Sequence, residues 1–184
     1  MVGEAIPVRF WNVAKLGLTQ GGLGIRDPSV HAPAAYLGSL ASTKDLCSRL
    51  DTGFDPDDCC GGSRKAETEV ELRSRVLEAA TWEDRAKPIS QKELSGLIDA
   101  AVRQSLLEQQ QTDAFFCADG ALNTLPGAAV WLTAAPVDDG REMDAPLFKV
   151  SLRRRLRVPV YDADGFCPCC GQTLDRWGDH ALTC

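Results

Sequence analysis

The residues most able to do chemistry are four metal-ligand types near the end of the chain, Cys167, Cys170, His180 and Cys184. Their spacing is C-x2-C-x9-H-x3-C, a pattern that can place three thiols and one imidazole around a tetrahedral Zn²⁺ ion. The segment that carries them, residues 161–184, is short and glycine-rich and can bury very little apolar surface of its own. The pattern therefore predicts a structural zinc site, closed by four protein ligands and without an open position for hydrolysis.

Cys169 is an alternative ligand in the same segment, because a C-x-C pair with Cys167 can also bind zinc, with more strain. The chain has eight cysteines, as disulfide-linked secreted domains often do. However, its first residues contain neither the basic nor the apolar region of a secretory signal. We therefore expect reduced thiols, an intracellular protein in the nucleus or cytoplasm, and no membrane partner.

A dense basic cluster directly precedes the cysteines and consists of Arg153, Arg154, Arg155 and Arg157. With about 100° of rotation per helical residue, Arg153, Arg154 and Arg157 share one face of a helix. Three guanidinium groups on an exposed face would suit the oxygen atoms of phosphates. The alternative is a solvated helix end, where the helix dipole favours positive charge in any protein.

Arg176 and Trp177 lie inside the predicted zinc-binding loop and are candidates for contact with nucleic acid. Trp177 could equally form the small core of that loop. Residues 1–140 hold 13 Lys+Arg against 20 Asp+Glu, whereas residues 141–184 hold 7 against 6. A net charge of −6 argues against a basic protein that wraps nucleic acid, but the uneven distribution favours a polyanion at the C-terminal end.

The elements that must position these residues are predicted to be helices. Asp27-Pro28 has the form of a helix start, and Ser90 with Glu93 matches a capping box. Periodic apolar residues then predict helices over residues 28–50, 64–83, 90–111 and 144–158, with interrupted helical segments over 114–135. We expect a mainly α fold, in which a small helical bundle is followed by a compact C-terminal zinc knuckle. The expected domains are a turn-rich segment (1–27), a helical domain (28–160) and the knuckle (161–184).

Two parts of the sequence resemble non-LTR retrotransposon reverse transcriptases, in the region that follows their catalytic palm. The N-terminal part is Gly21-Gly-Leu-Gly-Ile-Arg26 with Ala32-Pro-Ala-Ala-Tyr-Leu-Gly-Ser-Leu-Ala-Ser42. The C-terminal part is Leu152-Arg-Arg-Arg-Leu-Arg-Val-Pro159, Cys167-Pro-Cys-Cys-Gly171 and Gly178-Asp-His-Ala-Leu-Thr-Cys184. Residues 51–115 contribute little to the resemblance.

This resemblance implies a helical thumb-and-linker region with the family's Cys-Cys-His-Cys (CCHC) knuckle. The adjacent-aspartate motif of the palm is absent, so the chain is not expected to be an enzyme by itself. The implied role is to bind template RNA or target DNA as a fragment of a reverse transcriptase polyprotein. Two alternatives remain open: a zinc-stabilised helical module that binds a protein, and a non-functional retroelement relic.

Overall fold

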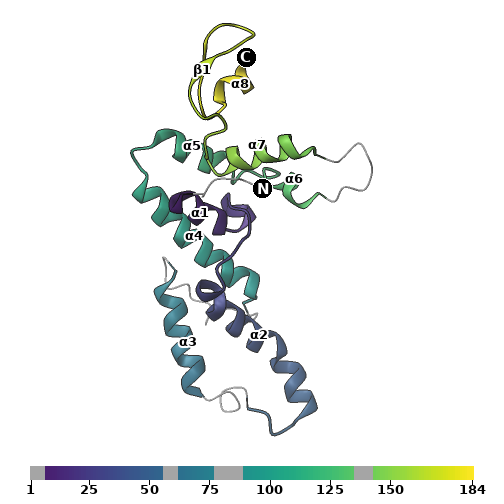
Figure 1. The fold of residues 1–184 in the computed structure, drawn as a ribbon. Coiled ribbons are helices and arrows are strands. Elements are labelled where there is room, and N and C mark those ends of the chain that lie inside the picture. The colour runs from purple at the N-terminus through teal and green to yellow at the C-terminus, as the bar shows by residue number, and fades with distance from the viewer. Residues whose placement is uncertain (1–6, 56–61, 77–88, 135–142) are drawn as a thin grey trace. The chain divides into compact units, whose positions relative to one another are not determined.

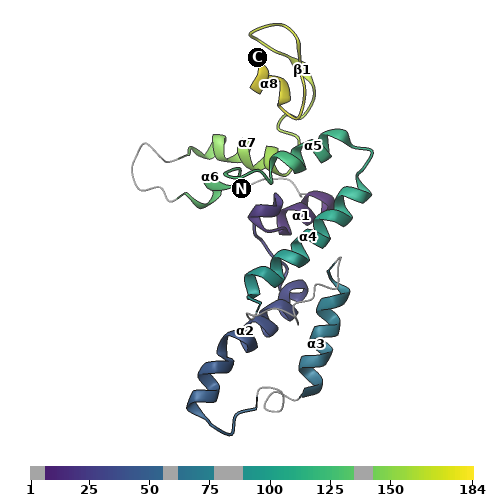
Figure 2. The same cartoon turned by 180° about the vertical axis from the view of Figure 1, so that it is seen from behind.

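The computed structural model describes residues 7–55, 62–76, 89–134 and 143–184 of the chain. Over these residues it contains eight α-helices, one 3-10 helix and one two-stranded hairpin (Figures 1 and 2). The prediction of a mainly α fold is confirmed. No helix in the described ranges has both the length and the apolar composition needed to cross a membrane.

Contacts divide the chain into two compact units. Unit 1 comprises residues 1–25 and 109–184, and unit 2 comprises residues 26–108. Unit 1 contains α1 (Val8–Lys15), η1 (Leu18–Gln20), α5 (Ala114–Leu122), α6 (Val130–Thr133), α7 (Ala145–Arg155), β1 (Gly165–Phe166), β2 (Thr173–Leu174) and α8 (Asp179–Thr183). Unit 2 contains α2 (Pro28–Leu50), α3 (Gly62–Ser74) and nearly all of α4 (Gln91–Gln109). The boundaries expected after residues 27 and 160 stay a prediction.

The predicted starts of two helices in unit 2 are confirmed by their caps. The Asp27 carboxylate accepts a hydrogen bond from the backbone N–H of Ser29 at the start of α2. At α4, Glu93 accepts from the backbone N–H of Ser90, and the hydroxyl of Ser90 accepts from the N–H of Glu93. The second helix is shorter than expected, because Arg75 and Val76 already lie in a turn and a bend after α3. Residues 77–83 of that prediction lie outside the described residues.

Unit 2 has its own apolar core, formed by Ala34 of α2, Leu72 of α3, and Leu94 and Ile98 of α4. Helices α2 and α3 lie side by side in both views (Figures 1 and 2). A buried carboxylate, Asp99, lies within the same unit and accepts a hydrogen bond of 2.7 Å from Arg26 Nη2. Its other oxygen lies 3.4 Å from Nε2 of His31, so the buried charge is compensated locally.

Unit 1 has a second core, in which Phe10 and Ala14 of α1 meet Leu156 and Val158. This core joins residues from the two ends of the chain. Beside it, the Arg155 side chain is only 5% exposed, and its guanidinium donates to three backbone carbonyls. The predicted final helix is confirmed as α7, and its N-cap Asp144 accepts from the N–H of Leu147.

Candidate metal centre

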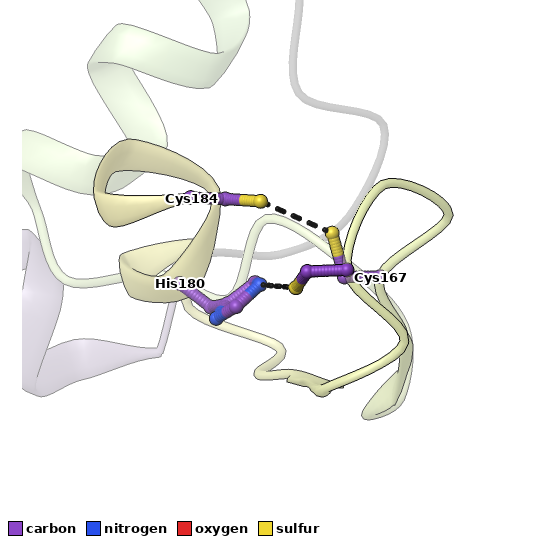
Figure 3. Close-up of side chains that lie close together, drawn as sticks. Cys167, His180 and Cys184 are labelled. Carbon is purple, nitrogen blue, oxygen red and sulfur yellow. Dashed lines mark hydrogen bonds between the residues drawn. The ribbon is translucent and has the colours of Figure 1, made fainter.

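The four residues predicted as metal ligands lie together in the structure. One side-chain ligand atom from each of Cys167, Cys170, His180 and Cys184 lies within 4.8 Å of all the others. The sulfur atoms of Cys167 and Cys184 are 3.6 Å apart, and Cys170 Sγ lies 3.2 Å from Nε2 of His180 (Figure 3). Tetrahedral zinc with Zn–S bonds of about 2.3 Å requires sulfur atoms about 3.8 Å apart, so these distances suit such an ion.

The first two ligands are held by a tight turn between β1 and β2. The strands pair antiparallel, with Gly165 opposite Leu174. The turn is closed by hydrogen bonds from Cys167 N–H to the Gln172 carbonyl (2.8 Å) and from Gly171 N–H to the Cys167 carbonyl (2.9 Å). Gly171 has φ 72°, a left-handed conformation that favours glycine, and it lets the chain reverse directly after Cys170.

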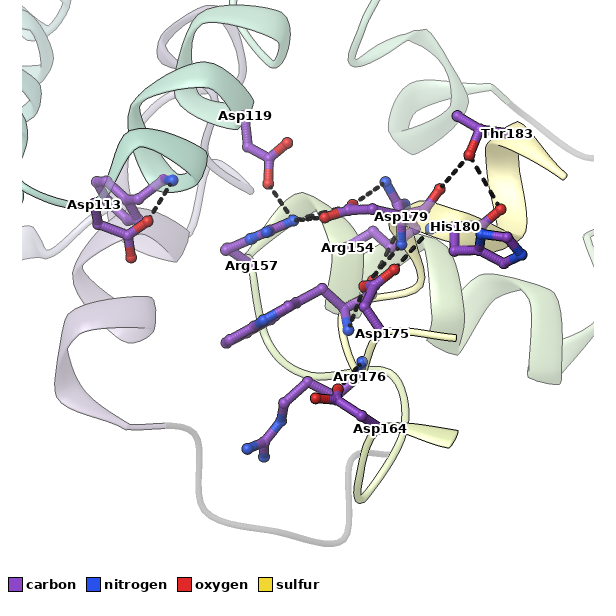
Figure 4. A network of polar contacts seen from close by, with 12 residues as sticks. Asp113, Asp119, Arg154, Arg157, Asp164, Asp175, Arg176, Asp179, His180 and Thr183 are labelled. Carbon is purple, nitrogen blue, oxygen red and sulfur yellow. Dashed lines mark hydrogen bonds and ion pairs between the residues drawn. The ribbon is translucent and has the colours of Figure 1, made fainter. Parts of the chain in front are cut away.

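Of the other two candidate ligands, His180 lies on α8 and Cys184 directly follows it, and the start of α8 is fixed by the carboxylate of Asp175. This carboxylate accepts hydrogen bonds from the backbone N–H groups of Trp177, Asp179 and His180 (Figure 4). Burial alone would raise the pKa of Asp175, but these N–H donors outweigh it and lower the pKa. Asp175 is therefore a charged group at the helix start that orients α8, which carries His180 and ends next to Cys184.

Two thiols of the cluster differ in the direction of their pKa shifts. The pKa of Cys167 is lowered to about 6, chiefly because the backbone N–H groups of Cys170 and Cys169 donate to its sulfur. The pKa of Cys184 is raised to about 11, because its thiol proton is shared with the sulfur atoms of Cys167 and Cys170. A divalent cation among these sulfurs would instead favour the thiolate form of each.

Cys169, the alternative ligand in the sequence, lies outside the cluster. Its side chain is exposed, and the convergent set contains its neighbour Cys170 instead. The C-x2-C spacing is therefore the one that the structure brings together with His180 and Cys184. The predicted ligand set lies where a metal could bind, whereas Cys59 and Cys60 lie at positions outside the described residues.

The arginine cluster differs from the exposed face expected from helical spacing. Arg157 is only 8% exposed, and Arg153 and Arg154 are half-buried. Arg153 Nε donates to the Pro159 carbonyl (2.6 Å), and Arg154 donates to the Trp177 carbonyl and to Asp179, both at 3.1 Å. These guanidinium groups therefore have internal partners that a helical projection cannot reveal.

Arg157 forms ion pairs with carboxylates from two helices, α5 and α8 (Figure 4). Its Nη1 lies 3.0 Å from Asp179 and 2.9 Å from Asp119 of α5. Its guanidinium carbon also lies 4.9 Å from the ring centre of Trp177 and 5.3 Å from that of Phe115. Burial raises the pKa of Asp119, and the nearby Arg157 acts in the opposite direction.

Arg176 and Trp177 lie beside the cluster as predicted, at the turn before α8. Arg176 is exposed, and its guanidinium lies 5.7 Å from the Trp177 ring. Among the described residues, no hydrogen bond or ion pair to this guanidinium is found. Trp177 is half-buried and contacts Arg157 as well, so its ring belongs partly to the internal packing of the segment.

Several supporting residues were missed by sequence reasoning, namely Phe115, Asp119, Asp175 and Asp179. Asp179 adjoins the predicted ligand His180, and this adjacency was the one local signal available. Phe115 and Asp119 come from a helix about fifty residues before Cys167, and no spacing rule connects them with the cysteines.

Three cysteines and one histidine with convergent ligand atoms define a Cys3His cluster that could hold a metal ion and that is compatible with zinc. Comparison of the chain with models of known protein families, with curated proteins and with solved structures finds no match.

Proposed function

We propose that the chain is a zinc-stabilised binding module, in which Cys167, Cys170, His180 and Cys184 hold one structural Zn²⁺ ion. The convergence of the four ligand atoms carries this proposal. Four protein ligands complete a tetrahedron and leave no position for a reactive water, so the ion would stabilise the fold and take no part in catalysis. The resulting unit would act by binding a partner and would not be an enzyme by itself.

Elemental analysis of the full chain tests the zinc site. We expect about one zinc ion per chain, because one tetrahedral site is formed. Cys170→Ser should abolish stoichiometric zinc, whereas Cys169→Ser should retain it, since the neighbouring thiol lies outside the cluster. Absence of zinc from the wild-type chain, or equal loss in both variants, would refute the site.

We further propose that the partner is RNA or DNA, and that the chain acts as the nucleic-acid-binding part of a retrotransposon reverse transcriptase polyprotein without its palm. The resemblance of residues 152–184 to that family supports this role. Arg176 is the best-suited phosphate contact, because it is exposed and its guanidinium has only an aromatic neighbour among the described residues. Arg154 and Arg157 would instead keep the tail folded, through Asp179.

Fluorescence anisotropy with single-stranded RNA and with duplex DNA tests this role. Binding should weaken as salt increases, and Arg176→Ala should reduce the salt dependence by about one phosphate contact. Lys149→Ala is the matched control, because Lys149 is an exposed cation on α7 outside the metal-bearing segment. Replacing Arg154 or Arg157 would be a poor test, because both are paired with Asp179 and their loss would also disturb the fold. Binding without salt dependence, or unchanged by Arg176→Ala, would exclude the proposed contact.

A protein partner is the second candidate, favoured by the net charge of −6 and by exposed apolar side chains in unit 1. Leu125 and Val130 are 56% and 63% exposed, and with Leu18 they line an apolar pocket. Recovery of a defined protein that remains bound after nuclease treatment would favour this candidate. Release of all bound material by nuclease would exclude it.

A further inference from the structure

We propose that Arg157 couples metal binding at the Cys3His cluster to the docking of α5. Through this side chain, metal binding would hold α5 more firmly, and α5 would in turn raise the affinity of the cluster for its metal. The inference rests on the proposed zinc site but adds a consequence that the site alone does not have.

On the metal-bearing side, Arg157 contacts two residues of the segment that orients His180. Its Nη1 donates to both carboxylate oxygens of Asp179, at 3.1 and 3.0 Å. Asp179 is the first residue of α8, which carries His180, and Cys184 follows this helix directly. The guanidinium carbon also lies 4.9 Å from the Trp177 ring centre. A metal that fixes α8 would therefore also fix the Asp179 carboxylate that is paired with Arg157.

On the other side, the same guanidinium contacts α5. Nη1 lies 2.9 Å from Asp119 Oδ2, and the guanidinium carbon lies 5.3 Å from the ring centre of Phe115. Asp119 and Phe115 are one helical turn apart, so they present a carboxylate and a ring to one cation. Arg157 is thus a direct link from α5 to the residue next to a metal ligand.

The backbone conformation at Arg157 favours glycine, so the reason for an arginine at this position lies in the contacts of its side chain. Arg157 has φ 53°, and among the described residues it is the only non-glycine residue with positive φ. The end of α7 is closed by hydrogen bonds from Arg157 N–H to the Arg154 carbonyl and from Val158 N–H to the Arg153 carbonyl. This geometry is a Schellman motif, whose left-handed position favours glycine. An arginine there bears a conformational cost that its side-chain contacts must offset.

The charge balance explains why the link should transmit metal binding. Arg157 is 8% exposed and lies between two carboxylates, Asp119 and Asp179. If α8 is not held, Asp179 is no longer fixed, and Asp119 alone must compensate a largely buried cation. The contacts to α5 are then weakened. Because such coupling is reciprocal, docked α5 raises the affinity for the metal by the factor by which the metal favours docking of α5, and loss of Arg157 should remove this contribution.

The test uses the full chain and two measurements, zinc affinity by competition with a chromophoric chelator and hydrogen exchange of α5 with and without Zn²⁺. In the wild type, zinc should slow exchange in residues 114–122. Arg157→Gly should lower zinc affinity about tenfold and remove the zinc-dependent part of that protection. Glycine suits the left-handed backbone, so this variant removes the side chain without straining the turn.

Two further variants separate coupling from general destabilisation. Asp119→Asn lies on α5, far in sequence from the ligands, and should also reduce both zinc affinity and zinc-dependent protection. Arg154→Ala removes a different contact to Asp179, and among the described residues Arg154 has no hydrogen bond or ion pair to α5, so this variant should lower zinc affinity while α5 still responds to zinc. A purely structural role for Arg157 would change exchange equally with and without zinc.

The outcomes distinguish this inference from the proposed function. A wild-type chain that binds no zinc would overturn both. A wild-type chain that binds zinc, with Arg157→Gly binding equally tightly and α5 still protected by zinc, would overturn the coupling alone. Normal zinc affinity and normal α5 protection in Asp119→Asn would overturn it as well.

Discussion

At the residue scale, a buried guanidinium that is held by backbone carbonyls organises unit 1. Arg155 donates to Leu18 (3.0 Å), Gly22 (3.0 Å) and Ala128 (3.1 Å), which belong to two separate loop regions, η1 with the turn that follows it and the turn between α5 and α6. Burial lowers the pKa of this guanidinium, yet an arginine side chain remains protonated at neutral pH. The carbonyl dipoles therefore compensate the buried charge and fix the two loops against α7.

Arg155→Lys should destabilise unit 1 by about 3 kcal/mol, because one ammonium cannot donate to three carbonyls in the directions of the guanidinium fork. Chemical denaturation followed by tryptophan fluorescence would measure the loss. Lys149→Ala, an exposed position on the same helix, should change stability by less than about 0.5 kcal/mol. Equal stability of Arg155→Lys and the wild type would show that the three hydrogen bonds contribute little.

The same residues show what a sequence can and cannot predict at this scale. The members of the Cys3His cluster were predictable because a zinc site would require particular residue types at short, recognisable spacings. The roles of Arg155 and Arg157 were not, because helical spacing places a side chain on a face without identifying the atoms opposite that face. The partners of Arg157, Asp119 and Asp179, come from two other helices.

At the scale of elements, the contact between α2 and the start of α4 depends on the absence of a side chain at one position. Gly38 is buried on α2, and a Cβ built there would lie 2.7 Å from the Cα of Gln91. Backbone atoms cannot move away as the end of a flexible side chain can. Glycine at this position therefore allows the close approach of α2 to the start of α4.

Gly38→Ala should destabilise unit 2 by about 1–3 kcal/mol, because the added methyl group forces the helices apart. Gly96→Ala on α4 is the matched control, since a Cβ there meets no atom within 4 Å. That control should stabilise the chain by about 0.5–1 kcal/mol through the higher helix propensity of alanine. Thermal unfolding of both variants measures the difference, and a destabilised control with an unaffected Gly38→Ala would contradict the proposed close approach.

Helix starts were more predictable than helix partners. The caps at Asp27, Ser90 and Asp144 depend on side chains next to the backbone groups they satisfy, so local sequence specifies them. The helix expected to extend to residue 83 ends at Ser74. Its end could not be predicted, because its apolar residues lie on a broad arc and give no clear end signal. Trp131 is half-buried and packs edge-on against Phe148, a contact that no local sequence signal indicates.

At the scale of the whole molecule, the arrangement into two units could not be derived from the sequence. Phe10 and Ala14 share a core with Leu156 and Val158, which follow them by 142 to 148 residues along the chain. Neither local propensity nor residue spacing carries information on such a long-range pairing. Unit 1 is formed from the two ends of the chain, and the domain boundaries expected after residues 27 and 160 stay a prediction.

This organisation predicts how far the effect of metal removal extends. The Cys3His cluster belongs to unit 1, and the core of unit 2 is formed only by residues of α2, α3 and α4. Treatment of the zinc-bound chain with a chelator should therefore increase hydrogen exchange in α7 and α8, and through Arg157 in α5. Exchange in α2 and in residues 91–106 of α4 should remain unchanged, because their apolar core is formed within unit 2 and includes none of the four cluster residues. An equal increase in both units would mean that the chain unfolds as one cooperative body, and it would refute the separation of the two cores.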